Sequence, residues 1–123
     1  MRFDIISIFP ESFASYFGVS MLRRAQEDGL IEIHTHNLRD FAHDRHKTVD
    51  DTPYGGGAGM VLKIEPLAEA LEQVSGIPAR PAGGRHQASG EKKEQEKRTR
   101  IILFSAKGRV FTQADARRLA LYD

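Results

Sequence analysis

The stretch FDIISIFPESFASYFGVSMLRRAQEDGLIEIHTHNL (residues 3–38) decides the fold, because strand-like and helix-like patterns alternate along it. FDIISIF (residues 3–9) is mostly apolar and β-branched and ends at Pro10, which is typical of a parallel strand buried on both faces. Apolar residues at helical spacing follow, with an interruption that predicts two short helices and with Gly29 as the closing cap. LIEIHTHNL (residues 30–38) then alternates apolar and polar residues, as a half-buried strand does.

The rest of the chain continues this alternation. The predicted elements are a strand at MVLKI, a helix at EPLAEALEQV, a buried strand at RIILFS and a helix at TQADARRLALYD (residues 60–64, 65–74, 100–105 and 112–123). The last helix has Thr112 as N-cap and Asp115 three residues on, a start similar to a capping box. These elements predict an α/β fold with a mainly parallel sheet and flanking helices, in which ligands bind at the carboxyl ends of strands.

The composition fits one ordinary globular domain. With 123 residues, 40% hydrophobic and 28% charged, the chain has room for one core. A net charge of +1 gives no overall field for nucleic acid, so any RNA contact must come from local patches. The absence of cysteine excludes disulfides and thiolate metal sites and fits a reducing cytoplasm. The apolar run at the N-terminus is too short for a signal sequence or a membrane span.

One segment, PARPAGGRHQASGEKKEQEKRT (residues 78–99), departs from the pattern because it has almost no apolar residues. It cannot bury enough surface to offset the entropy of ordering, which predicts a disordered insertion between a helix and a strand. The alternative is a basic arm for RNA, but Glu91, Glu94 and Glu96 dilute its positive charge.

The stretch DDTPYGGGAGM (residues 50–60) places four glycines within five positions, at 55, 56, 57 and 59. It lacks the Gly-Lys-Ser/Thr ending of a nucleotide-binding P-loop, and the spacing of a dinucleotide fingerprint is absent. A tight turn with positive φ angles explains one or two glycines. Four glycines beside Tyr54 favour a backbone surface against which something flat or bulky lies.

The preceding segment, HDRHKTVDD (residues 43–51), offers two chemistries. His43, Asp44 and His46, with His34 and His36 on the strand before them, have spacings compatible with a metal site. We favour the plainer interpretation, in which the two strand histidines lie on an exposed polar face.

Phosphate contact is the second chemistry. Arg45, His46 and Lys47 either form a solvated loop or supply charge and donors to phosphate. Asp50 and Asp51 are able to accept hydrogen bonds from the N–H groups of a base edge.

Three stretches, IISIFPESF, RDFAHDRHKTVDDTPYGGGAGMVLKIEPL and ILFSAKGRVFTQADARRLA, closely resemble the bacterial tRNA (guanine-N1)-methyltransferases of TrmD type, in the SPOUT superfamily. The resemblance covers the chain except for the predicted insertion. It implies transfer of a methyl group from S-adenosylmethionine to N1 of the guanosine 3′ of the anticodon in tRNA. It also implies a cytoplasmic homodimer with active sites at the subunit interface, and activity linked to magnesium.

The resemblance implies roles for individual residues. Those assigned to the target guanine and tRNA are Arg45, His46, Lys47, Asp50, Tyr54, Gly55, Gly56, Gly57 and Gly59. Those assigned to one wall of the S-adenosylmethionine pocket are Leu103, Phe104, Ser105, Ala106 and Gly108. The family commonly has Ser-Pro-Gln-Gly where this chain has Ser-Ala-Lys-Gly, which puts the rigidity of that loop in question.

Family members continue well beyond the position of Asp123, so the resemblance implies that this chain is the N-terminal part of an incomplete SPOUT (trefoil-knot) domain. The knot loops, the catalytic Asp, its assisting Arg and a C-terminal tRNA-binding domain are expected outside it. The catalytic base is therefore unknown here, and Asp50 is the only nearby carboxylate. The alternative function is a non-catalytic fragment that dimerises or binds RNA. An open sheet edge predicts aggregation or dimerisation of the isolated chain.

Overall fold

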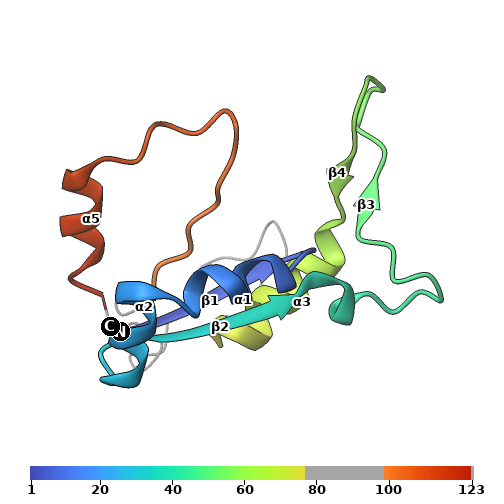
Figure 1. The fold of residues 1–123 in the computed structure, drawn as a ribbon. Helices are drawn as coiled ribbons and strands as arrows, with labels where there is room; N and C mark the ends of the chain where they lie inside the picture. Colours follow the sequence, from blue (N-terminus) through green and yellow to red (C-terminus); the bar gives the residue numbers. More distant parts are fainter. Residues whose placement is uncertain (77–98, 123) are drawn as a thin grey trace, which may run out of the picture. The chain divides into compact units, whose positions relative to one another are not determined.

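The computed structural model describes residues 1–76 and 99–122 (Figure 1). The chain divides into two units. The N-terminal unit comprises Arg2–Pro81, and the C-terminal unit comprises Ala82–Asp123 together with Met1. The insertion predicted at residues 78–99 lies, apart from Thr99, outside the described residues. In the described residues no helix is both long enough and apolar enough to cross a membrane.

The N-terminal unit is built on two parallel strands, β1 (Arg2–Ser7) and β2 (Glu32–Asn37). Their register places Arg2 opposite Glu32 and Ser7 opposite Asn37. The α/β class and the parallel sheet predicted from the sequence are therefore confirmed.

Two helices, α1 (Glu11–Phe17) and α2 (Ser20–Glu27), connect these strands, as the sequence predicts. The predicted cap at Gly29 is also confirmed, because this residue has a left-handed φ of 68°. Its N–H donates to the Gln26 carbonyl at 3.0 Å, and the N–H of Leu30 donates to the Ala25 carbonyl at 2.9 Å. This pair of bonds is a Schellman motif, which ends α2 and turns the chain into β2.

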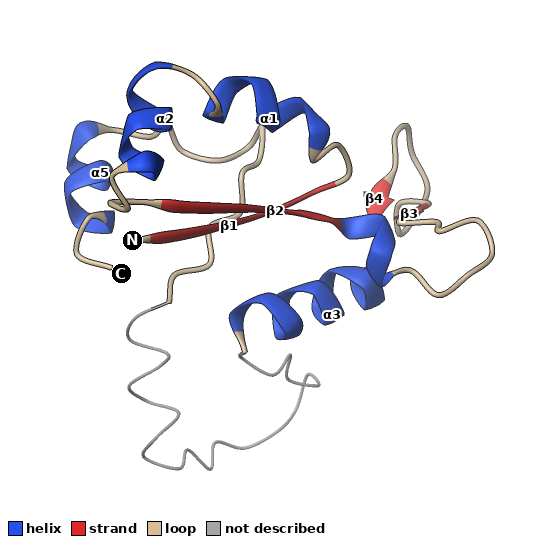
Figure 2. Cartoon of the chain, turned by 60° about the horizontal axis from the view of Figure 1, so that its bottom comes forward, coloured by secondary structure: helices blue, strands red, loops and turns tan. Residues whose placement is uncertain are grey.

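The helix α3 (Ile64–Ser75) lies on the opposite face of the sheet from α1 and α2 (Figure 2). It packs on η1 (Leu38–Phe41), a single 3-10 turn that follows β2. The core between them consists of Leu38, Ala42, Val49 and Ala70. Because Ala42 and Val49 are both core residues, the chain between them is fixed at its two ends.

The prediction of a strand within residues 3–9 is confirmed by β1, but the prediction that this strand is buried on both faces is wrong. No residue of β1 is fully buried, and Phe3 is 44% exposed. The physical reason is the width of the sheet, since among the described residues β1 pairs with β2 alone. A strand is buried on both faces only when further strands and helices enclose it.

A second, antiparallel pair joins β3 (Asp50–Asp51) to β4 (Val61–Leu62). The sequence predicts a short strand at residues 60–64 but no strand before the glycines. The partner was missed because a two-residue strand of aspartates carries no hydrophobic periodicity.

The described part of the C-terminal unit contains one helix, α5 (Gln113–Leu119). Its predicted start is confirmed as a capping box between Thr112 and Asp115. The strand predicted at RIILFS (residues 100–105) is wrong, because these residues have no strand conformation. A strand is stabilised by hydrogen bonds to a neighbour, and no such bond joins this segment to another described strand.

Candidate functional site

The four clustered glycines lie in the loop that joins β3 to β4, and we call residues 50–62 the glycine hairpin (Figure 1). All four have positive φ, 80° at Gly55, 78° at Gly56, 124° at Gly57 and 97° at Gly59. The Gly56 N–H donates to the Pro53 carbonyl at 3.0 Å, which closes a type II turn that needs a positive φ at Gly55. Backbone conformation alone therefore accounts for every one of these glycines.

This result favours the interpretation of the cluster as a tight turn, because the number of glycines no longer requires a ligand to explain it. One or two glycines were expected to suffice for a turn, but the loop uses all four. A Cβ added at any of them would meet no atom within 4 Å, so the backbone faces open space on the hairpin. The side chain of Tyr54 is 90% exposed beside it. The hairpin thus presents a bare backbone surface and an aromatic ring to solvent.

The two aspartates at the base of the hairpin differ in their surroundings. Asp51 accepts a hydrogen bond from the Thr52 N–H at 2.8 Å. Asp50 is half-buried, and its carboxylate has no hydrogen-bond partner among the described residues. Of the two, Asp50 is the carboxylate left available for a donor on a ligand.

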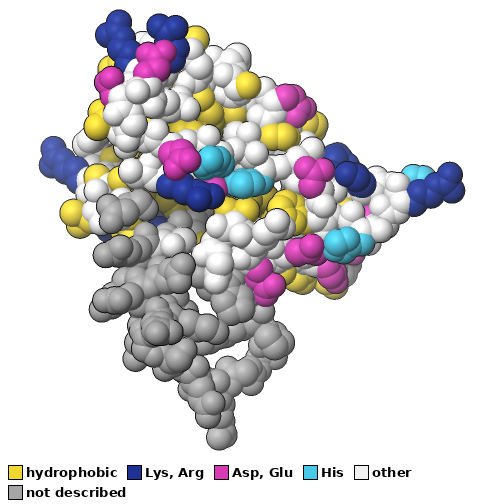
Figure 3. Space-filling view, turned by 90° about the horizontal axis from the view of Figure 1, so that it is seen from below, with side chains coloured by type: hydrophobic (Ala, Val, Ile, Leu, Met, Phe, Trp, Pro, Cys, Tyr) yellow, Lys and Arg dark blue, Asp and Glu magenta, His cyan; other side chains and the backbone are white. Residues whose placement is uncertain are grey.

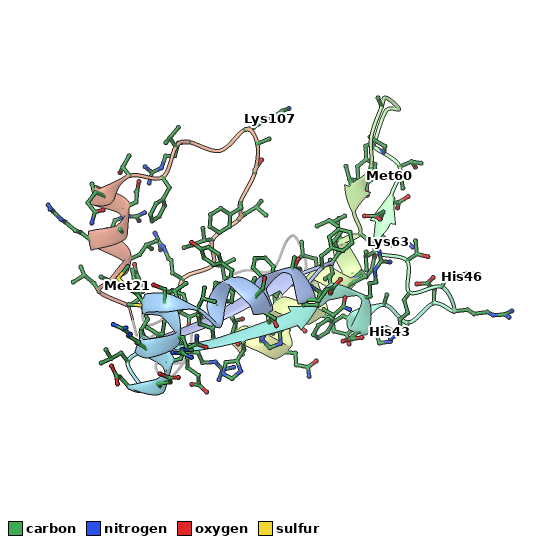
Figure 4. All side chains as sticks on the ribbon, in the orientation of Figure 1. Met21, His43, His46, Met60, Lys63 and Lys107 are labelled. Carbon is green, nitrogen blue, oxygen red and sulfur yellow. The ribbon has the colours of Figure 1, made fainter. Side chains whose placement is uncertain are left out.

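Residues 43–48, which we call the basic turn, protrude between the core residues Ala42 and Val49. Asp44 closes this turn by accepting from the Thr48 N–H at 2.9 Å and from the Thr48 hydroxyl at 2.8 Å. These bonds, first that from the Thr48 hydroxyl, hold the pKa of the Asp44 carboxyl below its usual value. Figure 4 shows His46 at the outer end of the turn.

The predicted phosphate contacts in the basic turn are all exposed, but they differ in their partners. Lys47 lies 3.3 Å from the Asp40 carboxylate and has a φ of 49°, which is unusual for a residue with a side chain. The side chains of Arg45 and His46 have no partner among the described residues. They are the groups of this turn that are available to an anion.

Of the histidines proposed as metal ligands, His34 and His36 lie side by side on β2, with ring centroids 6.5 Å apart, and these two and His43 each lie beside a carboxylate. His43 Nε2 lies 2.7 Å from Glu69 Oε2 on α3, and His36 Nε2 lies 2.9 Å from Asp4 Oδ1. His34 Nε2 lies 2.8 Å from Glu32 Oε1 in a contact that is not aligned as a hydrogen bond. In the described parts of the chain, no three His, Cys, Asp or Glu side chains are grouped to hold a metal ion.

The two strand histidines belong to a mixed-charge patch on one face of β1 and β2, seen from below in Figure 3. Arg2 and His36 both hydrogen bond to Asp4. Partial burial acts to raise the pKa of Asp4, but these bonds outweigh it and the net shift is downward. The patch is thus a set of paired charges, which agrees with a polar strand face.

The five residues assigned to a cofactor pocket lie in the C-terminal unit. Leu103 and Phe104 are 82% and 85% exposed, and we call residues 101–111 the exposed segment. Ser105 organises the loop, because its carbonyl accepts from the Gly108 N–H at 2.9 Å and its hydroxyl accepts from the Lys107 N–H at 3.2 Å. A Cβ on Gly108 would lie 2.9 Å from the Ser105 carbonyl oxygen, so only glycine fits.

The sequence analysis missed the contact that holds this loop to α5. Asp115 is 6% exposed and accepts from both terminal nitrogens of Arg109 and from the Thr112 hydroxyl at 2.8 Å. These bonds, first those from Arg109, hold the pKa of the Asp115 carboxyl well below its usual range. The capping box was a signal for Asp115, but no local pattern identifies Arg109 as its partner.

An open hollow of about 360 Å³ lies at the carboxyl end of β2. Its lining residues are Thr35, His36, Asn37, Asp40, Phe41 and Gln73. None of the residues assigned to guanine or cofactor lines it.

Comparison with known proteins identifies close relatives. Residues 1–123 match the family described as tRNA (Guanine-1)-methyltransferase TrmD. The chain is 44% identical over 122 residues to a tRNA (guanine-N(1)-)-methyltransferase of Thermomicrobium roseum, covering 99% of this chain and 39% of the relative. It is 45% identical over 120 residues to that of Geobacter metallireducens, covering 98% of this chain and 42% of the relative.

A solved structure is also similar. The crystal structure of the tRNA (m1G37) methyltransferase from Aquifex aeolicus superposes with a TM-score of 0.57 and 38% identity. The match covers 62% of this chain and 34% of that one. The chain therefore spans about two fifths of the length of the curated relatives that it matches, 39% and 42% for the two named above.

Proposed function

The chain belongs to the tRNA (guanine-1)-methyltransferase family, and we propose that it supplies the guanine-binding loop and one wall of the methyl-donor pocket of such an enzyme. The proposed reaction transfers a methyl group from S-adenosylmethionine to N1 of the guanosine 3′ of the anticodon, position 37 of tRNA. The observation that carries the proposal is the glycine hairpin, whose bare backbone and exposed Tyr54 suit a planar base.

The glycine hairpin is proposed to bind the target guanine. A planar base lies close to a backbone only where Cβ atoms are absent, and the open space at all four glycines provides this. Tyr54, which is 90% exposed, offers a ring on which a base stacks. The unpaired carboxylate of Asp50 is suited to accept hydrogen bonds from the N–H groups on the Watson–Crick edge of guanine.

The basic turn is proposed to bind the tRNA backbone. Arg45 has a forked guanidinium that is exposed and unpaired among the described residues, which suits bidentate contact to phosphate. Lys47 supplies a further positive charge, shared with Asp40. His46 stands next to Arg45 in the turn, its side chain is likewise exposed and unpaired among the described residues, and it is proposed to contact the same tRNA.

The exposed segment is proposed to form one wall of the S-adenosylmethionine pocket. Its residues fit the group, because Leu103 and Phe104 present apolar side chains to an adenine ring and the turn at Ser105, Ala106 and Gly108 presents backbone groups. S-adenosylmethionine supplies an electrophilic methyl group when it is bound. Two hydrogen bonds to Ser105 close the turn, so the turn forms although Ala106 stands where the family commonly has proline.

Methylation at N1 replaces the proton that N1 carries in neutral guanine. The enzyme must therefore place a base near N1 and a donor near O6, where negative charge develops. Asp50 is assigned to binding of the guanine edge rather than to proton removal. No residue of this chain is assigned as the base, in keeping with the resemblance, which places that residue outside it.

The resemblance further leads us to propose a cytoplasmic homodimer with an active site shared between subunits. The exposed apolar side chains of the chain, among them Val110 and Leu121, support an association that covers them. Sedimentation velocity is expected to show dimers or larger species, and a monomer that persists at high concentration contradicts this. The resemblance also links the activity to magnesium, and we assign no residue of this chain to it.

Methyl transfer by the protein as its gene encodes it tests the proposed function. Labelled S-adenosylmethionine is supplied with two tRNAs that differ only in having guanosine or adenosine 3′ of the anticodon. Nucleoside analysis is expected to find N1-methylguanosine in the first tRNA alone. Binding of the guanosine tRNA without any methylation would instead support the non-catalytic, RNA-binding alternative.

A further inference from the structure

The basic turn has an unusual construction for an exposed loop, because its side chains hold its backbone in one conformation. Its ends are fixed by two core residues, Ala42 at 9% exposure and Val49 at 0%. The Val49 carbonyl also accepts from the Lys63 N–H at 2.8 Å, which ties the end of the turn to the start of α3. The protruding residues between these anchors are thus held to a rigid base.

Asp44 closes the protruding part. Its carboxylate accepts from the N–H and the hydroxyl of Thr48, and its carbonyl accepts from the Lys47 N–H at 3.0 Å. The left-handed φ of 49° at Lys47 is a costly conformation for a residue with a Cβ. Such strain persists only where surrounding bonds hold it, and it is common at functional sites.

Two further contacts brace the turn from outside. Arg39 donates to the Lys47 carbonyl at 3.4 Å, and His43 contacts Glu69 of α3 at 2.7 Å. Both are exposed contacts, as those of Asp44 are, and an exposed pair such as His43 with Glu69 contributes little free energy. The bonds of Asp44 differ in that they span the turn itself, from residue 44 to residues 47 and 48, so they define its conformation.

We propose that Asp44 is a positioning residue for RNA, which holds Arg45 and His46 at the apex of the basic turn in the geometry that meets phosphate. This inference rests on the proposed function, because it assumes that the turn contacts tRNA. The arrangement of partners supports it: Asp44 and Thr48 bind each other, whereas the side chains of Arg45 and His46 are left unpaired among the described residues. Asp44 itself is turned toward the loop and does not contact the RNA.

The sign of the charge change makes this proposal testable. Replacing Asp44 removes a negative charge from a surface that faces polyanionic RNA, which by electrostatics alone strengthens binding. Replacement also frees the turn, which weakens binding if Asp44 has a positioning role. A loss of affinity in Asp44→Ala is therefore opposite to the purely electrostatic effect.

The experiment measures binding of the protein as its gene encodes it to an anticodon stem-loop RNA that carries guanosine 3′ of the anticodon, over a range of salt concentrations. Arg45→Ala/His46→Ala is expected to weaken binding about tenfold and to lower the salt slope by about 1. Asp44→Ala is expected to weaken binding about fivefold to tenfold, and Asp44→Asn by less because one acceptor oxygen remains. Asp28→Ala, an exposed aspartate at the end of α2, is the matched charge control and is expected to bind at least as well as the parent.

A double-mutant cycle separates positioning from a general loss of structure. Asp44→Ala is expected to change affinity by less than about twofold when Arg45 and His46 are already alanine, because nothing is left to position. An equal loss in both backgrounds contradicts the proposal, as does parent-like binding by Asp44→Ala. If Arg45→Ala/His46→Ala binds as the parent does, the phosphate contact in the proposed function fails and this inference fails with it.

Discussion

The glycine hairpin and the exposed segment belong to different units of the chain, and they obtain their conformations in different ways. The hairpin is held by its own backbone, with a type II turn at Pro53 and positive φ angles at four glycines. The strand predicted at residues 100–105 covers the first part of the exposed segment, yet these residues have no strand partner among the described residues. It is apolar and exposed, with Phe104 at 85% exposure.

This contrast has consequences for mutation. A change in the glycine hairpin acts through backbone strain, because the conformation itself excludes side chains. A change in the exposed segment acts through lost contacts with a ligand, because its side chains have little to pack on within the unit. Substitutions in the two regions should therefore differ in whether they alter activity through the fold or through binding.

The largest effect is expected at Gly57, whose φ of 124° is accessible almost only to glycine. Gly57→Ala should impose about 1–3 kcal/mol of strain and lower kcat/KM for tRNA about 10- to 100-fold, measured in the protein as its gene encodes it. Ala58→Gly is the matched control in the same loop and should retain most activity. Equal activity of the Gly57→Ala variant and the parent would show that the loop conformation is not needed.

A smaller effect is expected at Phe104, by a different route. Phe104→Ala should weaken S-adenosylmethionine binding about tenfold in calorimetry, because apolar contact with the adenine ring is lost. The melting temperature should change little, since the side chain is 85% exposed. Tyr16→Ala, an exposed aromatic residue on α1, is the control and should bind the donor normally. A large drop in melting temperature would place Phe104 in a core instead.

The start of α5 tests how the exposed segment is anchored. Thr112→Ala removes the cap and should destabilise α5 by about 1 kcal/mol. Hydrogen exchange of the backbone amides of α5 measures this loss. The pH dependence follows from the lowered pKa of Asp115. Its stabilisation is complete above the ordinary carboxyl pKa of about 3.9 and is lost as the pH falls from there through the lowered folded value. Loss of the α5 helix at a pH well above 4, as the pH is lowered, would contradict this.

The smallest effect is expected at Ala106, where the chain departs from its family. Residue 106 is the second position of the turn closed by Ser105 and Gly108, a position that favours proline. Ala106→Pro should raise the free energy of unfolding by about 0.5 kcal/mol by restricting the unfolded chain. Denaturant titration measures it, with Lys107→Pro as the unfavourable control because the Lys107 N–H is hydrogen bonded. A stable Lys107→Pro variant would show that the turn is not held as described.

The sequence predicted those features whose causes are local. The cap at Gly29, the two short helices and the capping box at Thr112 depend on residues within a few positions of one another. The strand predicted at residues 100–105 was wrong because strand formation depends on a partner elsewhere, which the apolar run does not reveal. The sequence likewise did not predict the hydrogen bonds between Asp44 and Thr48 and between Arg109 and Asp115, because no local pattern identifies the two partners of each bond.

The central claim is that the glycine hairpin faces the guanine to be methylated, and photo-crosslinking tests it most directly. A tRNA with 6-thioguanosine at the position 3′ of the anticodon is bound to the protein as its gene encodes it, irradiated and mapped by mass spectrometry. We predict that the crosslink falls within the glycine hairpin (residues 50–62), with Tyr54 as the main site, and that Tyr54→Ala reduces it. Crosslinks confined to other parts of the protein, with none in the hairpin, would contradict the account.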